Sequence, residues 1–182
     1  MVSVRKTTEA DEAAIWRVQE AAFGGQAGRT IADLTIALLH DPTATPFLSL
    51  LAYSGSAPIG HVLFTSVSIS GSDSSPTAHI LAPLAVVPEH QRQGTGTQLV
   101  QAGLSALEES GSELVFVLGH PEYYPRFGFL PAGQRGFSAP YPIEKKNASA
   151  WMVLELRPGV IESNRGAVQC AEALNDPAHW RE

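Results

Sequence analysis

The turn from Gln91 to Gly96 has the residue types and spacing with the clearest chemical potential. It follows a strand-like run ending in two valines and precedes a run with helical spacing. A helix N-terminus leaves backbone N–H groups unpaired, and Gly94 and Gly96 have no Cβ to keep a phosphate away from them. With side-chain donors from Gln91 and Arg92, such a turn could hold a diphosphate. An ordinary glycine-bearing turn fits the same pattern, and neither a P-loop nor a GxGxxG motif is present.

The context of this turn resembles a known family. Gln91-x-x-Gly94-x-Gly96 is similar to the acetyl-CoA-binding motif Q/R-x-x-G-x-G/A of the GNAT superfamily of acyl-CoA N-acyltransferases. Tyr124, four residues before Gly128, resembles the Tyr-x-x-x-Gly-Phe element of that family. Residues 117–124 look like a bacterial subgroup of predicted N-acetyltransferases. The resemblance implies a mixed, mostly antiparallel sheet that is splayed at the cofactor site and flanked by helices.

The resemblance also implies the cofactor, acetyl-CoA, and the residues around it. The pantetheine arm would lie along the end of the third long strand, and the pyrophosphate would lie in the glycine-bearing turn. No metal is implied. The cofactor-binding residues expected on this basis are Leu84, Val86, Val87, Gln91, Arg92, Gln93, Gly94, Thr95, Gly96 and Phe127.

Tyr124 corresponds to the family's general acid, which would return a proton to the CoA thiolate. The pKa of a thiol is about 8.5 and that of a phenol is about 10, so this proton transfer requires close positioning. A half-buried packing role is the alternative for Tyr124. Its neighbour Tyr123 is expected to be a pocket wall or a surface residue.

The base that would deprotonate the acceptor amine is less clearly indicated. The pKa of a protonated alkylamine is about 10.4, so the acceptor must lose a proton at pH 7. Many family members have a carboxylate on the third strand. Here residues 78–87 contain no carboxylate, and His79 is the only titratable side chain among them. His120 and Glu122 lie close to Tyr124 in sequence, and an imidazole suits base catalysis. Structural roles for both histidines, and a chain of waters in place of a base, remain alternatives.

The expected reaction is direct attack of a primary amine on the thioester through a tetrahedral intermediate. A small-molecule amine is the first choice of acceptor. The alternatives are a protein or peptide amine, or a CoA-binding regulatory domain without turnover. The residues expected to contact or wall the acceptor are Phe23, Gln26, Arg29, Phe137 and Tyr141.

The elements that would position these residues change in type along the chain. The pattern predicts strands at 2–6, 47–53, 59–70, 78–87, 114–118 and 151–156, and helices at 9–23, 30–40 and 95–110. An antiparallel meander followed by a βαβ unit makes this a mixed α/β fold. Pro83 predicts a bulge or splay in its strand, and residues 71–76 predict a flexible hairpin loop.

Length and composition limit the class of protein. The 182 residues carry a net charge of −6, which argues against a nucleic-acid-binding protein. The single cysteine, Cys170, excludes a disulfide scaffold. No signal peptide or membrane span is expected, so we predict the cytoplasm. Residues 1–156 are expected to form the acetyltransferase domain, with 157–182 as an extension packed on it, and a homodimer is consistent with the resemblance.

Overall fold

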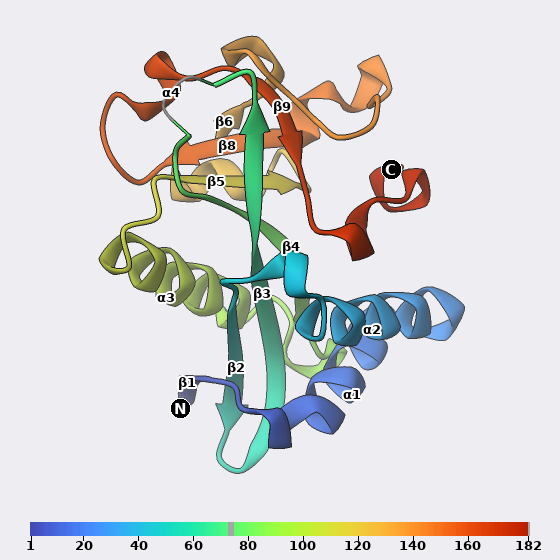
Figure 1. Ribbon diagram of the computed structural model, residues 1–182. Coiled ribbons are helices and arrows are strands. Elements are labelled where there is room, and N and C mark those ends of the chain that lie inside the picture. The colour runs from blue at the N-terminus through green and yellow to red at the C-terminus, as the bar shows by residue number, and fades with distance from the viewer. Residues whose placement is uncertain (73–74, 182) are drawn as a thin grey trace.

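One mixed sheet organises the computed structural model, which describes residues 1–72 and 75–181 (Figure 1). Its strand order is β1-β2-β3-β4-β5-β8-β6, and all neighbours are antiparallel except the parallel pair β4–β5. The mostly antiparallel mixed sheet predicted from the sequence is confirmed. The strands are β1 Val2–Lys6, β2 Leu48–Ser54, β3 Ala57–Ser70, β4 Ala78–Val86, β5 Leu114–Leu118, β6 Leu130–Pro131 and β8 Trp151–Glu155.

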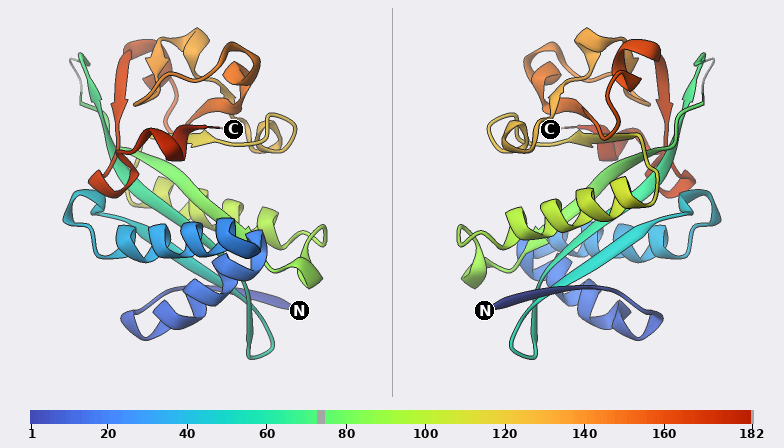
Figure 2. Two further views of the ribbon diagram at one scale, coloured as in Figure 1. Left: turned by 90° about the vertical axis from the view of Figure 1, so that its right-hand side faces the viewer. Right: turned by 90° about the vertical axis from the view of Figure 1, so that its left-hand side faces the viewer.

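Helices cover both faces of strands β2 to β4 (Figures 1 and 2). The helices α1 (Glu12–Phe23) and α2 (Gly25–Leu39) lie on one face, and α3 (Thr95–Glu109) lies on the other. The start of α2 was predicted at Thr30, but the helix begins at Gly25. Two glycines within residues 25–29 lower the helix propensity there, which hid the first turn of α2 from the sequence pattern.

The helix α3 packs unusually closely on β3 because two glycines make room for large side chains. A Cβ on Gly103 of α3 would lie 2.2 Å from the ring of Phe64. Conversely, a Cβ on Gly60 of β3 would lie 2.9 Å from the side chain of Leu99. Each element therefore inserts one side chain into a notch in the other.

The sheet opens between β4 and β5, as predicted. The two strands pair only from Ala78 with Leu114 to Leu81 with Val117. Beyond Leu81, β4 continues along β3 alone. The expected bulge lies at this point, because Ala82 and Pro83 together oppose a single residue of β3. Pro83 has no backbone N–H with which to continue the ladder.

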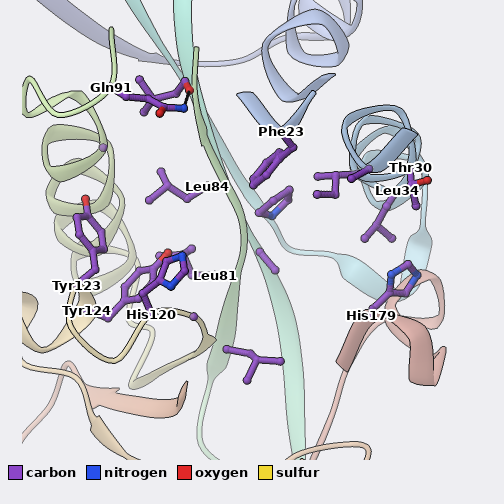
Figure 3. A pocket seen from close by; sticks show the side chains of 18 of the residues that line it. Phe23, Thr30, Leu34, Leu81, Leu84, Gln91, His120, Tyr123, Tyr124 and His179 are labelled. Carbon is purple, nitrogen blue, oxygen red and sulfur yellow. Dashed lines mark hydrogen bonds between the residues drawn. The ribbon is translucent and has the colours of Figure 1, made fainter. Parts of the chain in front are cut away.

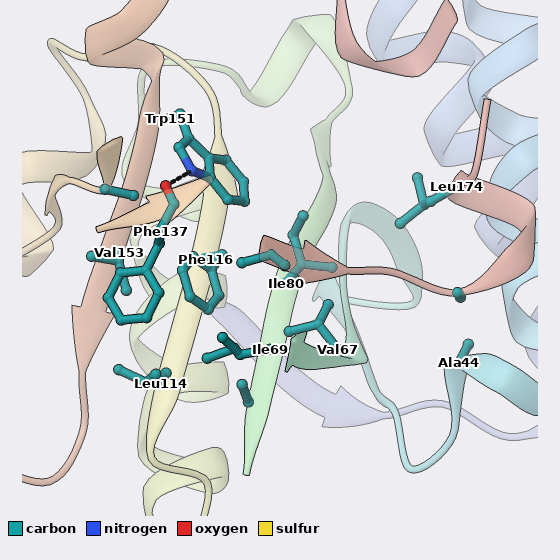
Figure 4. Packing of buried hydrophobic residues seen from close by; sticks show 14 of the residues in the cluster. Ala44, Val67, Ile69, Ile80, Leu114, Phe116, Phe137, Trp151, Val153 and Leu174 are labelled. Carbon is teal, nitrogen blue, oxygen red and sulfur yellow. Dashed lines mark hydrogen bonds between the residues drawn. The ribbon is translucent and has the colours of Figure 1, made fainter. Parts of the chain in front are cut away.

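The far end of the sheet carries an aromatic core (Figure 4). Phe116 stacks on Trp151 with ring centroids 5.4 Å apart, and Trp180 meets Trp151 edge-on at 5.8 Å. The C-terminal part of the chain contributes to this core through α4 (Val160–Ser163), β9 (Gly166–Gln169) and the residues that follow. The strand β9 pairs with the end of β3 and with β7 (Phe137–Ser138).

The tip of the predicted hairpin loop, residues 73–74, lies outside the described residues. In the part of the chain that is described, no helix has the length and apolar character needed to cross a membrane.

A buried histidine lies between α1 and the sheet. Both ring nitrogens of His61 lie 2.8 Å from a polar atom, namely Gln19 Nε2 and Ser49 Oγ. An imidazolium would have to donate from both nitrogens, but an amide nitrogen cannot accept. Burial lowers the pKa of His61 to about 3, so the folded protein holds this ring neutral.

We predict that the protein loses stability between pH 7.5 and pH 5.5. The unfolded chain takes up a proton at His61 below its ordinary pKa of 6.5, whereas the folded chain does not. One pH unit below that value, this group alone costs about 1.4 kcal/mol. Urea unfolding at the two pH values measures the loss. His61→Gln should flatten the pH dependence, whereas the control His120→Gln, at an exposed histidine, should not. A stability that stays constant or rises towards pH 5.5 would contradict the prediction.

Candidate active site

A cavity of about 1220 Å³ occupies the opening between β4 and β5 (Figure 3). Leu81, Leu84 and Val86 of β4 line its middle. On one side lie the turn before α3 and the segment that follows β5, and on the other side lies α2. The cavity therefore extends across both sides of β4 and connects the predicted phosphate turn with Tyr124.

The glycine-bearing turn faces this cavity. Gln91, Arg92, Gly94 and Gly96 line the cavity. Gly94, with φ of +89°, is the last residue before α3, and no atom lies within 4 Å of the position that its Cβ would take. The side chain of Gln91 fastens the turn to the sheet, because its Nε2 donates to the Val86 carbonyl at 2.9 Å. The prediction that Gln91 also offers its amide to a phosphate stays a prediction, since the amide nitrogen has a second N–H donor.

Tyr123 covers the first turn of α3 from the other side. A Cβ on Gly96 would lie 3.0 Å from Tyr123 Oη, and the same hydroxyl lies 3.4 Å from Thr97 Oγ1. Arg126 lies over the Tyr123 ring at 4.3 Å and donates from Nε to the Tyr123 carbonyl at 2.8 Å. Tyr123 is thus a wall of the pocket. Thr97 also lines the cavity. The sequence analysis did not predict it, because the motif ends one residue earlier, at Gly96.

This end of the cavity fits a diphosphate. The N-terminus of α3 contributes unpaired N–H groups, and glycines keep the approach open. His90, Arg92 and Arg126 also line the cavity. No aspartate or glutamate belongs to its lining within residues 1–72 and 75–181, so no side-chain carboxylate would repel an anion there.

Two residues of the motif, Gln93 and Thr95, do not line the cavity, and their contact with the cofactor stays a prediction. The side chain of Gln93 donates from Nε2 to the Glu89 carbonyl at 3.0 Å and so closes the turn. Thr95 is buried against β3, where its methyl group lies beside Gly60. The sequence held a signal for Thr95, because Thr95, Leu99 and Gly103 share one face of a helix.

Val87 and Phe127 also do not line the cavity, and their contact with the cofactor stays a prediction. The N–H of Val87 donates to the Ile59 carbonyl at 2.9 Å, which keeps it in the sheet. Phe127 packs edge-on against Tyr123 with centroids 5.5 Å apart. It supports the pocket wall from behind. Leu84 and Val86 line the cavity, and their contact with the cofactor stays a prediction.

Tyr124 and His120 lie next to each other at the edge of the opening (Figure 3). The backbone N–H groups of Tyr123 and Tyr124 donate to the His120 carbonyl at 3.0 and 3.3 Å, which winds the segment into a turn. The ring of Tyr124 is buried and packs edge-on against Phe129 at 5.7 Å. Gly119 leaves room for it, since a Cβ there would lie 2.4 Å from the ring. The structure thus holds the tyrosine rigidly and leaves the histidine exposed beside it.

His79 and Glu122 do not line this cavity. His79 is buried, with Nδ1 2.8 Å from Ser112 Oγ and Nε2 3.2 Å from the Pro46 carbonyl, and burial lowers its pKa. The prediction of His79 as a base is corrected, because both nitrogens are engaged in the core. A structural role, which the sequence analysis gave as the alternative for His79, fits these contacts. Glu122 lines a separate recess beside His120.

The acceptor side of the cavity differs from the prediction in part. Phe23 and Gln26 line it as expected. Arg29 does not line it and donates from Nη2 to Gln26 Oε1 at 3.3 Å. Phe137 is buried in the aromatic core, and the Tyr141 hydroxyl donates to Asn175 Oδ1 at 2.9 Å. The residues that complete this side come from α2 and from the chain between residues 174 and 181: Ala27, Thr30, Ile31, Leu34, Leu174, Ala178, His179 and Arg181.

Comparison with known proteins finds similarity to acetyltransferases along most of the chain. A family model described as an acetyltransferase (GNAT) domain matches residues 3–132. The uncharacterized N-acetyltransferase YjhQ of Escherichia coli K12 is 45% identical over 168 residues, which cover 91% of this chain and 90% of YjhQ. The uncharacterized N-acetyltransferase YhbS of the same strain is 33% identical over 146 residues, covering 79% and 84%.

Solved structures agree with the fold and with the cofactor. The crystal structure of E. coli YhbS in complex with CoA has a TM-score of 0.84 and 29% identity, and the match covers 96% of this chain and 92% of that one. A GNAT acetyltransferase from Brucella melitensis in complex with acetyl-CoA has a TM-score of 0.74 and 27% identity, with 96% and 98% covered. The cofactor predicted from the sequence is the one these relatives bind.

The family model covers more than half of the chain, and the two curated relatives match it over most of their own length. The fold and the enzyme class predicted from the sequence are therefore confirmed. The chain belongs to the GNAT family of acetyltransferases and is an acyltransferase.

Proposed function

We propose that this protein transfers the acetyl group of acetyl-CoA to the primary amine of a small molecule. One observation carries the proposal: a single cavity joins the glycine-bearing start of α3, the opening between β4 and β5, and the Tyr124–His120 pair. Acetyl-CoA would supply the acetyl group as a thioester: the amine nitrogen would bond to the acetyl carbon first, and the C–S bond would then break to release CoA as the thiolate. The chain's own residues must then bind the cofactor and move two protons.

The residues of the turn are proposed to hold the pyrophosphate. The N-terminus of α3 and the open surface at Gly94 and Gly96 provide N–H donors, and Arg92 provides positive charge. The pantetheine arm is proposed to lie against Leu84 and Val86, where β4 has no neighbour on the β5 side. The backbone of β4 at these residues resembles the free edge of a sheet, and such an edge can pair with an amide-bearing chain.

Tyr124 and His120 are proposed to move the protons. The packed ring of Tyr124 holds its hydroxyl in a fixed place, which suits a general acid towards the departing sulfur. His120 is exposed in the same cavity and is proposed to accept the proton of the amine. A cavity with walls on both sides of β4 favours a small acceptor over a folded protein chain.

Gly94→Glu should weaken acetyl-CoA binding by about 100-fold or more. The carboxylate would occupy the proposed phosphate site, and each lost hydrogen bond to a charged group costs about 1.5–3 kcal/mol. Isothermal titration measures the affinity. Gly55→Glu is the matched control, since Gly55 has a similar φ of +61°, equally open surroundings and a place in the distant β2–β3 hairpin. Unchanged affinity in folded Gly94→Glu would disprove the assignment of the turn.

Tyr124→Phe should lower kcat by about 100-fold or more while the affinity for acetyl-CoA stays within about twofold. The substitution removes the proposed acid but keeps the ring that fills the space over Gly119. Steady-state release of CoA thiol across an amine panel, with cofactor titration in parallel, separates the two effects. If kcat is unchanged, Tyr124 has only a packing role.

His120→Ala should remove the acidic limb of the kcat/KM profile. A base works only when unprotonated, so the activity of the unmodified enzyme should fall as the pH drops through the pKa of the base. The variant should be slower by about 100-fold at neutral pH and should lack that fall. His40→Ala, outside the cavity, is the control. An acidic limb that persists in His120→Ala would assign the base to another group or to water.

A further inference from the structure

The wall opposite Tyr124 and His120 is built by two segments that lie far apart in the sequence. Figure 3 shows Thr30, Leu34 and His179 on one side of β4, with Tyr124 and His120 on the other. His179 and Arg181 belong to the C-terminal segment, defined here as residues 172–181, and both line the cavity. Figure 1 shows this segment next to α2. The acceptor side of the cavity is therefore completed by the C-terminal segment.

This segment is held in place by specific contacts. Trp180 is buried against Trp151, and its indole N–H donates to the Leu174 carbonyl at 2.9 Å. Asp41, just after α2, accepts the N–H of Ala173 through Oδ2 at 2.9 Å. Since Trp180 is anchored, the residues on each side of it, His179 and Arg181, are held at the cavity.

Among the residues that the structure describes, this wall carries one cationic side chain, Arg181. His179 and Arg181 are donors to an anion, and, in the described part of the chain, no acidic side chain lines the cavity to balance them. The donors proposed for the cofactor phosphates, among them Arg92, lie at the start of α3, whereas His179 lies across β4 from that turn. A polyamine would find no carboxylate in such a wall. An acceptor with its own negative charge would find two donors.

The rest of the wall is apolar. Ala27, Ile31 and Leu34 follow one another at intervals of three or four residues, so they form one stripe along α2. Phe23, the last residue of α1, also lines the cavity. Phe23 is 45% exposed, which is high for a large apolar residue. This stripe could cover the apolar part of a bound molecule.

We propose that the acceptor is a primary amine with an apolar body and an anionic group, either a carboxylate or a phosphate, which Arg181 and His179 bind. The inference rests on the proposed acetyl transfer and names its substrate class. A guanidinium binds carboxylates and phosphates through paired N–H donors, and an imidazole adds another donor. With the anion held at the C-terminal segment, the apolar body would lie along the α2 stripe and the amine would point across β4 towards His120.

The test measures binding of three matched amines to the CoA-loaded protein by isothermal titration: L-phenylalanine, L-phenylalaninol phosphate and neutral L-phenylalaninol. We expect at least one anionic ligand to bind tenfold or more tightly than phenylalaninol. Which of the two does so distinguishes a carboxylate from a phosphate site. Arg181→Gln should reduce that preference to within about threefold, which corresponds to a loss of about 0.7 kcal/mol or more. The control Arg17→Gln, exposed on α1 and outside the cavity, should keep it.

The outcomes separate this inference from the proposed function. Equal binding of all three amines, or a preference that Arg181→Gln does not change, would overturn the anion site. Release of CoA thiol in the presence of the same amines tests transfer independently. Binding that depends on the anion and on Arg181, without any thiol release, would support the anion site and contradict the acetyl transfer. Transfer to phenylalaninol as fast as to its anionic partners would support the transfer and overturn the anion site.

Discussion

The early end of the ladder between β4 and β5 is the constraint on which the site depends. The two strands pair over four residues each and then separate, because β4 bulges at Ala82 and Pro83 and Pro83 has no N–H to offer. A sheet that stayed paired would have no room for a ligand in its middle. The separation exposes one edge of β4 without losing the strand, since β3 continues to pair with it. The cavity is thus a product of backbone hydrogen bonding before it is a matter of side chains.

Several unrelated segments converge on this opening. The start of α3 lies at one end of it, and the turn that carries His120 and Tyr124 follows directly from β5. Tyr123 links the two, with its hydroxyl over the first turn of α3 and its backbone in the turn of His120. On the proposed function, this tyrosine holds the cofactor-binding end and the catalytic end in a fixed relation.

The sequence predicted most of the elements and the segments that border the opening. Local sequence signals exist for the motif at Gln91 to Gly96, for the element at Tyr124 and for the bulge at Pro83. Glycine, proline and helix starts affect the backbone over only a few residues. The role of His79 was wrong, since its burial depends on partners more than thirty residues away, Ser112 and Pro46. His179 and Arg181 were missed for the same reason. Nothing in a Pro- and Ala-containing tail indicates that a tryptophan fastens it beside α2.

The interlocked contact between α3 and β3 has a consequence for ligand affinity. Phe64 fills the notch at Gly103 and Leu99 fills the notch at Gly60, so the helix can neither slide nor rotate on the strand without a steric clash. We therefore expect the N-terminus of the helix to be preorganised, with its position set by this packing before an anion binds. Little conformational entropy is then lost when a ligand arrives, and more of each hydrogen bond appears as binding free energy.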